Sequence, residues 1–441
     1  MSMTIEEDQN KLFDLVKKIV AEREKTKKFV PGQTLVQYSG DVTDGSELTA
    51  VIASLLDGRL AFGKKVEEFE NKFANYLNVK DAVAVSTGSD ALLITMHALM
   101  NKHREEPLKA GDEVITCALN FATPISSLIF SGLTPVFVDT ILGNYTIDSE
   151  LIENAITGRT KAIIATHLFG NLANMKVILE LAEKYNLRVI EDCCDAHGSV
   201  YGGKKAGSMG DAGAFSFYPA HGMTMGGEGG IISTNDENLS YVVRSLRQWG
   251  RALPCKYCGN DLSKDCVNKH NLDLAGMEDY DMNYLFINLG FNSKIREAQG
   301  AFGLEQLKKL DEFNKIRESN FRFVVKALKP YEDVLILPEA TKNSNPAWYN
   351  IPLTIKPGAN FTRKEILEFL SKSKIEYRNL FAGNILKQPG FKQIPHRVSG
   401  SLKNADITTA NSFFIGCYQG ITPEMREYIV QQLTLFLDKA H

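Results

Sequence analysis

Short apolar runs alternate with segments of helical spacing over residues 47–310. Six runs are almost continuously apolar: DAVAVST (81–87), DEVITC (112–117), TPVFVD (134–139), KAIIATHLF (161–169), LRVIED (187–192) and AGAFSFY (212–218). Such runs are typical of strands that are buried on both faces, and their alternation with helices is typical of parallel sheets. The pattern therefore predicts an α/β fold with a mostly parallel sheet, in which ligands gather at the carboxyl ends of the strands.

The ends of the chain follow other patterns. Residues 8–27 have helical spacing, and a long amphipathic helix is predicted over about 296–328. After it, residues 334–338, 348–355 and 375–380 are strand-like, whereas residues 361–371 and 423–440 have helical spacing. We expect three parts, namely an N-terminal helix and arm (1–46), a large domain (47–310) and a smaller α+β C-terminal domain (311–441).

Composition narrows the classes of partner. The 441 residues include 50 Lys and Arg against 53 Asp and Glu, a formal charge of −3, without a block of like charges. This balance does not favour a nucleic acid or a membrane surface as partner. The charged N-terminus lacks the apolar core of a signal peptide, and no run approaches the ~20 apolar residues of a membrane helix. We expect a cytoplasmic protein, in which seven cysteines do not form a disulfide framework.

Polar and aromatic side chains stand where the predicted strands end. The first run is followed by Ser86-Thr87-Gly88-Ser89-Asp90, which begins a helix. The free backbone N–H groups of this helix suit a phosphate, but an ordinary N-capped turn without a ligand has the same sequence pattern. Phe121 follows the second run and either stacks on a flat ring or belongs to the core. Asp192 ends the fifth run, where its carboxylate pairs with a ring nitrogen or faces solvent.

The sixth run ends at a hydroxyl and leads to a histidine. Ser216 is placed to contact a phosphate, and His221 stands five residues later in FSFYPAHGMTMGGEGG (215–230). A histidine here is either a surface loop residue or a group that moves protons near neutral pH. With the other strand ends, these two residues indicate a site for a phosphate-bearing aromatic cofactor.

The stretch VIEDCCDAHGSVYGGKKAGSMGDAGAFSFYPAHGMTMGGEGG (189–230) resembles the sugar aminotransferase and dehydrase family of fold-type I pyridoxal-phosphate (PLP) enzymes. The resemblance extends from about residue 37 to the C-terminus. It implies the fold-type I PLP-dependent transferase fold, with the cofactor in the large domain. The family carries a lysine that forms a Schiff base with PLP where this chain has His221. The subgroup with histidine in that place is the nucleotide-sugar 3-dehydrases.

The resemblance assigns roles to particular positions. It implies that Asp192 pairs with the pyridinium nitrogen, that Phe121 stacks on the ring, and that the phosphate is held by Gly88, Ser89 and Ser216. Asn292, in LGFNSK, matches a family motif that reaches the phosphate of a neighbouring subunit, which implies a homodimer with shared active sites. Many family aminotransferases have Arg in place of Lys294. The segment around Arg378 lies near the sugar in related dehydrases, although a structural arginine is an equal alternative there.

The cysteines suggest a metal centre. Cys255, Cys258 and Cys266 have ligand spacing, and a fourth thiolate would come from the pair Cys193-Cys194, which directly follows Asp192. Four thiolates suit a zinc ion or an iron–sulfur cluster equally well. Beside a cofactor, however, an iron–sulfur cluster can transfer single electrons, whereas zinc is redox-inert. The chain resembles the CDP-4-keto-6-deoxyglucose 3-dehydrases, which hold a 2Fe-2S cluster with one ligand directly before Asp195-Ala196, and this implies Cys194. Two residues separate Cys255 from Cys258, where those enzymes have one.

These features predict a C-3 dehydrase for a nucleotide-linked 4-keto-6-deoxyhexose. The resemblance implies that the nucleotide is CDP and that the enzyme acts in the biosynthesis of 3,6-dideoxyhexoses of lipopolysaccharide. Its cofactor would be pyridoxamine 5′-phosphate (PMP), bound without a covalent link, with His221 as the base. Reduction would use the cluster and a separate NADH-dependent flavin or iron–sulfur reductase, since no GxGxxG motif follows a strand. The sequence also allows a GDP-4-keto-6-deoxymannose 3-dehydrase-like enzyme without the cluster, a nucleotide-sugar aminotransferase, or a non-catalytic zinc-binding scaffold.

Overall fold

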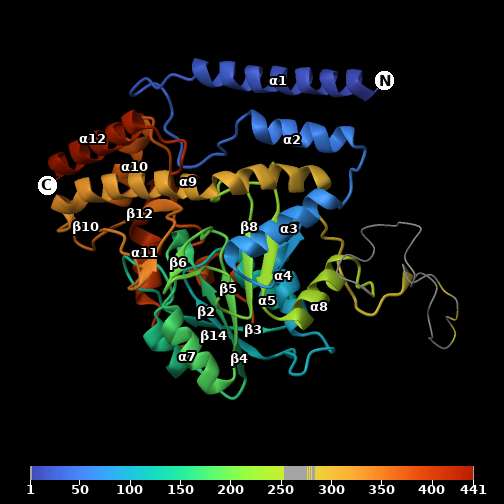
Figure 1. Cartoon of the computed structure of the whole chain (residues 1–441). Coiled ribbons are helices and arrows are strands. Elements are labelled where there is room, and N and C mark those ends of the chain that lie inside the picture. The colour runs from blue at the N-terminus through green and yellow to red at the C-terminus, as the bar shows by residue number, and fades with distance from the viewer. Residues whose placement is uncertain (1, 253–275, 277, 279, 281–283, 441) are drawn as a thin grey trace.

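An eight-stranded sheet forms the centre of the molecule (Figure 1). The computed structural model describes residues 2–252, 276, 278, 280 and 284–440. The strands lie in the order β1 (Asp81–Val85), β9 (Gly230–Thr234), β8 (Ala212–Ser216), β5 (Arg188–Asp192), β4 (Thr160–Thr166), β2 (Glu113–Cys117), β3 (Thr134–Val138) and β14 (Arg397–Val398). All neighbours are parallel except β1–β9 and β8–β9. The mostly parallel sheet and all six predicted strands are confirmed.

Helices cover both faces of this sheet. They are α3 (Lys64–Leu77), α4 (Gly88–Leu99), α5 (Ala122–Phe130), α6 (Ile152–Ala155), α7 (Met175–Tyr185) and α8 (Glu237–Arg247). Successive residues of a strand point to opposite faces. In β1, accordingly, Ala82 and Ala84 belong to one buried cluster, whereas Val83 and Val85 belong to the other, which includes apolar residues of α4 and α8. The two cores explain why these strands are continuously apolar.

The C-terminal part has its own four-stranded antiparallel sheet. Its order is β10 (Leu335–Ile336), β12 (Asn350–Ile355), β15 (Ser412–Gly416) and β13 (Tyr377–Asn379), with helices α10 (Arg363–Lys372), α11 (Lys403–Asn411) and α12 (Pro423–Ala440). This agrees with the predicted α+β pattern, to which the structure adds β15 and α11. The long helix α9 (Glu297–Leu328) runs through residue 310, and β14 joins the large sheet, so the domain boundary at 310 stays a prediction.

The N-terminal residues form the predicted helix and one more. The first helix, α1 (Ser2–Thr26), lies along α2 (Gly45–Leu56), and α2 packs against α9 (Figure 1). A small sheet joins β11 (Ser344–Asn345), β6 (Val200–Tyr201) and β7 (Lys204–Lys205). Among the described residues, no helix combines the length and the apolar character that crossing a membrane requires.

Candidate active site

A cavity of about 680 Å³ opens where β5 and β8 end. Eight of the residues predicted for the site line it: Gly88, Ser89, Phe121, Asp192, Cys194, Ser216, His221 and Arg378. They come from segments up to 290 positions apart in the sequence. The expectation that strand ends would gather these side chains is therefore met, whereas Asn292 is not on the lining of this cavity.

The start of α4 forms one wall of the cavity. Thr87 is the N-cap, and its side chain accepts a hydrogen bond from the Asp90 N–H at 3.0 Å. Gly88 and Ser89 supply the first amides of the helix, which intrahelical hydrogen bonds cannot use. A Cβ added to Gly88 would lie 2.4 Å from the Ser216 Cβ, so glycine is required for the helix start to pack on β8. Free amides beside a hydroxyl suit a phosphate.

Gly88→Ala should weaken cofactor binding by about tenfold or more, because the added methyl must displace Ser216 from the phosphate wall. Titration of the purified variant with PMP, followed by absorbance, measures the effect. Gly158→Ala is the matched control, since its added Cβ would meet no atom within 4 Å and it should bind PMP like the parent protein. Equal affinity of the Gly88 variant would remove this turn from the phosphate site.

Asp192 is a buried carboxyl group at the end of β5. It is only 5% exposed, and the Cys194 N–H donates to its Oδ1 at 3.2 Å. Among the described residues no cation forms an ion pair with it, and burial raises the pKa of this carboxyl. The interpretation as a solvated strand terminus is therefore wrong. A protonated ring nitrogen would supply the missing positive charge, so Asp192 fits the pyridinium position.

Glu191 anchors the strand end that carries Asp192. Its buried carboxylate accepts the N–H groups of Gly207, Met209 and Gly210 at 2.7–3.0 Å and lies 3.0 Å from His167 Nε2. His167 Nδ1 accepts the Ala173 N–H at 3.2 Å, so Nε2 carries the proton toward Glu191. His167, Glu191 and Cys193 lie close enough to hold a metal, but these hydrogen bonds occupy both ring nitrogens. The cluster is therefore structural, and it was not predicted.

His221 follows β8 and faces the cavity. Its side chain is 16% exposed, its backbone N–H donates to the Tyr218 carbonyl at 2.9 Å, and its ring lies 5.5 Å from that of Tyr349. The interpretation as a surface loop histidine is therefore wrong. Nδ1 lies 3.3 Å from Asp195 Oδ1, an ion-pair distance whose angle falls short of a regular hydrogen bond. Catalytic contacts of this kind are often loose before substrate binds.

No lysine lines the cavity in the part of the chain that the structure describes. Lys204 and Lys205 lie in β7 of the small sheet. Lys205 Nζ donates to the Tyr76 carbonyl at 2.8 Å and lies over the Tyr76 ring. Neither residue stands at the cavity, so the position after β8 offers an imidazole and no described amine.

Phe121 and Arg378 both line the cavity, but they differ in their surroundings. Phe121 is the N-cap residue of α5 and is 53% exposed, which rules out its interpretation as a core residue. Its exposed ring is available for stacking. The Arg378 guanidinium pairs with Glu376 at 2.6 Å and lies over the Tyr38 ring at 4.5 Å. Arg378 therefore already has partners, and a substrate group would share or replace them.

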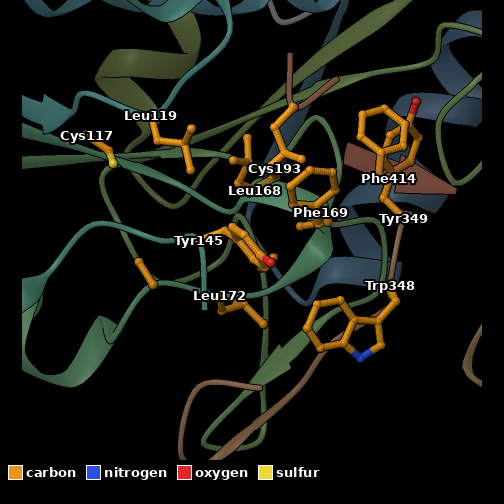
Figure 2. Packing of buried hydrophobic residues seen from close by; sticks show 14 of the residues in the cluster. Cys117, Leu119, Tyr145, Leu168, Phe169, Leu172, Cys193, Trp348, Tyr349 and Phe414 are labelled. Atoms are coloured by element: carbon orange, nitrogen blue, oxygen red, sulfur yellow. The ribbon is translucent and has the colours of Figure 1, made fainter. Parts of the chain in front are cut away.

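The vicinal cysteines differ in their surroundings. Cys193 is fully buried in the apolar cluster that includes Leu168 and Phe169 (Figure 2), whereas Cys194 lines the cavity. Burial raises the pKa of both thiols well above the ordinary value. Cys194, the ligand that the resemblance implies, is therefore the member of the pair that faces the cavity. The predicted ligands Cys255, Cys258 and Cys266 lie outside the described residues. Cys117 and Cys417 are buried.

Asn292 is exposed and is not among the residues that line the cavity of its own chain. Its side-chain oxygen accepts a hydrogen bond from Lys294 Nζ at 3.0 Å. Lys294 lies over the Trp249 ring, and burial together with neighbouring arginines lowers its pKa to about 8. Leu289, close by in the sequence, is 98% exposed. Asn292 is thus an exposed residue, three positions after an exposed apolar one.

Known proteins resemble this chain along most of its length. Residues 42–434 match the model of the DegT/DnrJ/EryC1/StrS aminotransferase family. The lipopolysaccharide biosynthesis protein RfbH of Salmonella typhimurium is 39% identical over 98% of this chain and 99% of its own length. The dTDP-4-dehydro-2,6-dideoxy-D-glucose 3-dehydratase of Saccharopolyspora spinosa is 38% identical over 93% and 88%.

The fold has a close counterpart among solved structures. The E. coli GDP-4-keto-6-deoxy-D-mannose-3-dehydratase with bound hydrated PLP superimposes with a TM-score of 0.81, at 28% identity, over 91% of this chain and 100% of that chain. This likeness confirms the predicted fold, the α/β fold of PLP-dependent sugar aminotransferases and dehydratases.

Proposed function

We propose that this chain, which belongs to the DegT/DnrJ/EryC1/StrS aminotransferase family, catalyses the C-3 dehydration of a nucleotide-linked 4-keto-6-deoxyhexose with PMP. One observation carries the proposal. His221 lies at the cavity after β8, and no lysine lines that cavity in the described part of the chain. An imidazole accepts and returns a proton but forms no imine with a cofactor. A histidine at this position therefore favours an elimination reaction over an aminotransferase reaction, which needs a lysine Schiff base.

Each residue of the lining would have a separate task. The amides of Gly88 and Ser89 and the Ser216 hydroxyl would bind the phosphate, while Asp192 would keep a proton on the pyridine nitrogen. When bound, PMP supplies an amine for the sugar ketone and a ring that accepts electrons. His221 would accept the proton from C-4′ of the cofactor, and loss of the C-3 hydroxyl would follow.

The aromatic lining would exclude water from this chemistry. Tyr38, Phe121, Tyr349, Phe381 and Phe414 contribute rings to the cavity wall. The Phe381 ring packs 6.4 Å from that of Phe121 and 5.4 Å from that of Phe414, which joins the two parts of the chain across the cavity. A largely apolar wall strengthens the electrostatic contacts of Asp192 and protects a reactive product from hydrolysis.

Asp192→Asn should weaken PMP binding by about 30-fold or more, since a buried charge-paired hydrogen bond is worth about 2 kcal/mol or more. The apoprotein should unfold at the same temperature or higher, because the variant removes a buried carboxylate that has no cationic partner among the described residues. Absorbance titration and thermal unfolding measure the two effects. Tight PMP binding by the variant would contradict the pyridinium role.

The proposed substrate carries CDP. The cluster-bearing dehydratases that this sequence resembles use CDP-linked sugars, whereas the two dehydratases described above are named for dTDP- and GDP-linked ones. The likeness to a lipopolysaccharide biosynthesis protein supports a place in the synthesis of 3,6-dideoxyhexoses of the O-antigen. Arg378, which lines the cavity, would contact the substrate.

We further propose that Cys194, Cys255, Cys258 and Cys266 hold a 2Fe-2S cluster. A separate NADH-dependent flavin or iron–sulfur reductase would feed it, because the dehydrated sugar needs two electrons and two protons to become a 3-deoxy product. The proposal is supported by Cys194, which lines the cavity beside Asp192. A homodimer would place the exposed Asn292 at the neighbouring subunit's phosphate site.

Assays with CDP-, dTDP- and GDP-linked 4-keto-6-deoxyhexoses would test this function. The protein is reconstituted anaerobically with PMP and iron–sulfide, and loss of the C-3 hydroxyl is followed by mass spectrometry. Turnover of the CDP sugar is expected. Turnover of the GDP sugar alone, by protein without iron, would favour the cluster-free dehydratase.

An aminotransferase and a zinc-binding scaffold would each leave a different chemical signature. A lysine peptide labelled by the cofactor after borohydride reduction would favour an aminotransferase. Zinc without iron or any pyridoxal species would favour the zinc-binding scaffold.

A further inference from the structure

A closed ring of polar contacts holds His221 from two sides. Arg317 Nη2 donates to the His221 carbonyl at 3.0 Å, and His221 Nδ1 lies 3.3 Å from Asp195 Oδ1. Asp195 Oδ2 accepts the Phe169 N–H at 3.1 Å, and the Phe169 carbonyl accepts the Tyr349 N–H at 2.8 Å. The Tyr349 carbonyl accepts Arg317 Nη1 at 3.0 Å, which closes the ring. Four residues from other parts of the chain thus hold the backbone and the side chain of His221 in place.

The backbone of Phe169 determines how Asp195 is oriented. Phe169 is fully buried and has a φ of 58°, an uncommon conformation for a non-glycine residue that the packing around it maintains. Its N–H is a donor, so the atom of residue 195 that faces it must be an acceptor. Asp195 therefore turns its second oxygen toward His221. At 3.3 Å from Nδ1, this carboxylate oxygen favours the imidazole form that carries its proton on Nδ1.

A proton on Nδ1 determines the chemistry of the other ring nitrogen. In a neutral imidazole only one nitrogen carries hydrogen, so Nε2 has a free lone pair and is the basic atom. The carboxylate also stabilises the imidazolium that forms once Nε2 accepts a proton. The same division of roles operates when a carboxylate orients a catalytic histidine in hydrolases.

Arg317 holds the other end of the residue. It lies on α9, is 1% exposed, and forms no ion pair with a described residue. Burying a guanidinium without a carboxylate partner lowers the stability of the folded protein, so a gain in stability does not explain the position of Arg317. Its planar fork instead ties the loop after β8 to the residue that precedes β12. The placement of His221 is thereby linked to the docking of the C-terminal sheet.

We propose that Asp195 and Arg317 are positioning residues for His221: Asp195 keeps the proton on Nδ1 so that Nε2 is the base, and Arg317 fixes the backbone that carries the ring. The inference rests on the proposed function for its catalytic consequence. The tautomer itself is a property of the free protein and is measured without cofactor or substrate.

Asp195→Asn tests the orientation directly. The Phe169 N–H would still require the side-chain oxygen, so the amide NH₂ would face His221 and donate to Nδ1. The proton would then move to Nε2. Two-bond ¹H–¹⁵N correlation spectra of ¹⁵N-histidine-labelled protein, recorded at mildly alkaline pH, distinguish the two tautomers, and His221→Asn identifies the signal of His221. We expect the Nδ1–H form in the parent protein, the Nε2–H form in the variant, and dehydration slowed about 10³-fold.

Two further variants provide the comparison. Asp148→Asn makes the same chemical change at a residue that caps a short helix elsewhere, where asparagine caps equally well, and it should alter neither the tautomer nor the rate. Arg317→Lys keeps the charge but lacks the planar fork. It should keep the Nδ1–H tautomer and lower the rate of dehydration about tenfold or more, with little change in KM.

An Nε2–H tautomer in the parent protein would overturn the proposal. So would an Asp195→Asn variant that keeps its rate, or one that loses its rate without a change of tautomer. If the parent protein dehydrates no nucleotide sugar but has the expected tautomers, the proposed function fails and the orientation by Asp195 stands.

Discussion

His221→Asn should reduce C-3 dehydration by at least about 10³-fold while PMP still binds. Asparagine fills a similar space but cannot accept a proton at neutral pH, so residue 221 would no longer supply a base for the C-4′ proton. The groups assigned to the phosphate and the ring nitrogen, at Gly88, Ser216 and Asp192, are unchanged. Dehydration is measured by mass spectrometry of the sugar, and PMP affinity by absorbance titration. Activity that persists in this variant would reject His221 as the base.

His221→Lys provides a positive control for the same position. The parent protein should carry no cofactor after treatment with PLP, borohydride and denaturant, since no described lysine lines the cavity. The lysine variant should retain cofactor that maps to residue 221. A parent protein labelled at another lysine would show that an amine reaches the cavity, and an aminotransferase would then be the preferred function.

The sheet was largely predictable because a strand that is buried on both faces appears in the sequence as a run of consecutive apolar residues. Strands β3 and β4 each contain four consecutive apolar residues, 135–138 and 162–165, as expected for parallel strands between two helical layers. Among the strands that were not predicted, the two with five residues were missed for different reasons. The short β9 directly follows a glycine-rich loop and reads as its continuation. The other, β15, is central in its sheet but directly follows α11, without a turn signal between them.

The candidate site was predictable where a residue ends a strand. Asp192 and Ser216 are terminal residues of β5 and β8, so the topology alone brings them together. Arg317 left no signal, because it acts on a backbone carbonyl 96 residues away. Asp195 had a signal that was not used, since it is a second carboxylate just beyond a strand end.

The pair Cys193 and Cys194 offers the sharpest test of the electron path. Cys194→Ser should abolish the brown colour of anaerobically purified protein and the formation of the 3-deoxy sugar, because a serine hydroxyl is a poor substitute for a cluster thiolate. Dehydration should persist, since His221 and Asp192 are unchanged. The neighbouring variant Cys193→Ala removes a thiol that is buried in the apolar core. It should lower stability by about 1 kcal/mol and keep both colour and product.

These variants show which of the two neighbouring cysteines is the ligand and whether reduction of the sugar depends on the cluster. Colour is measured by the visible spectrum before and after dithionite, and the product by mass spectrometry with an NADH-dependent reductase present. Loss of colour in Cys193→Ala, with colour kept in Cys194→Ser, would move the ligand into the core and contradict the placement of Cys194 at the cavity. If the serine variant of all four proposed ligands still delivers the 3-deoxy sugar, electrons reach the cofactor by another route. Reduction would then not depend on a cluster beside Asp192.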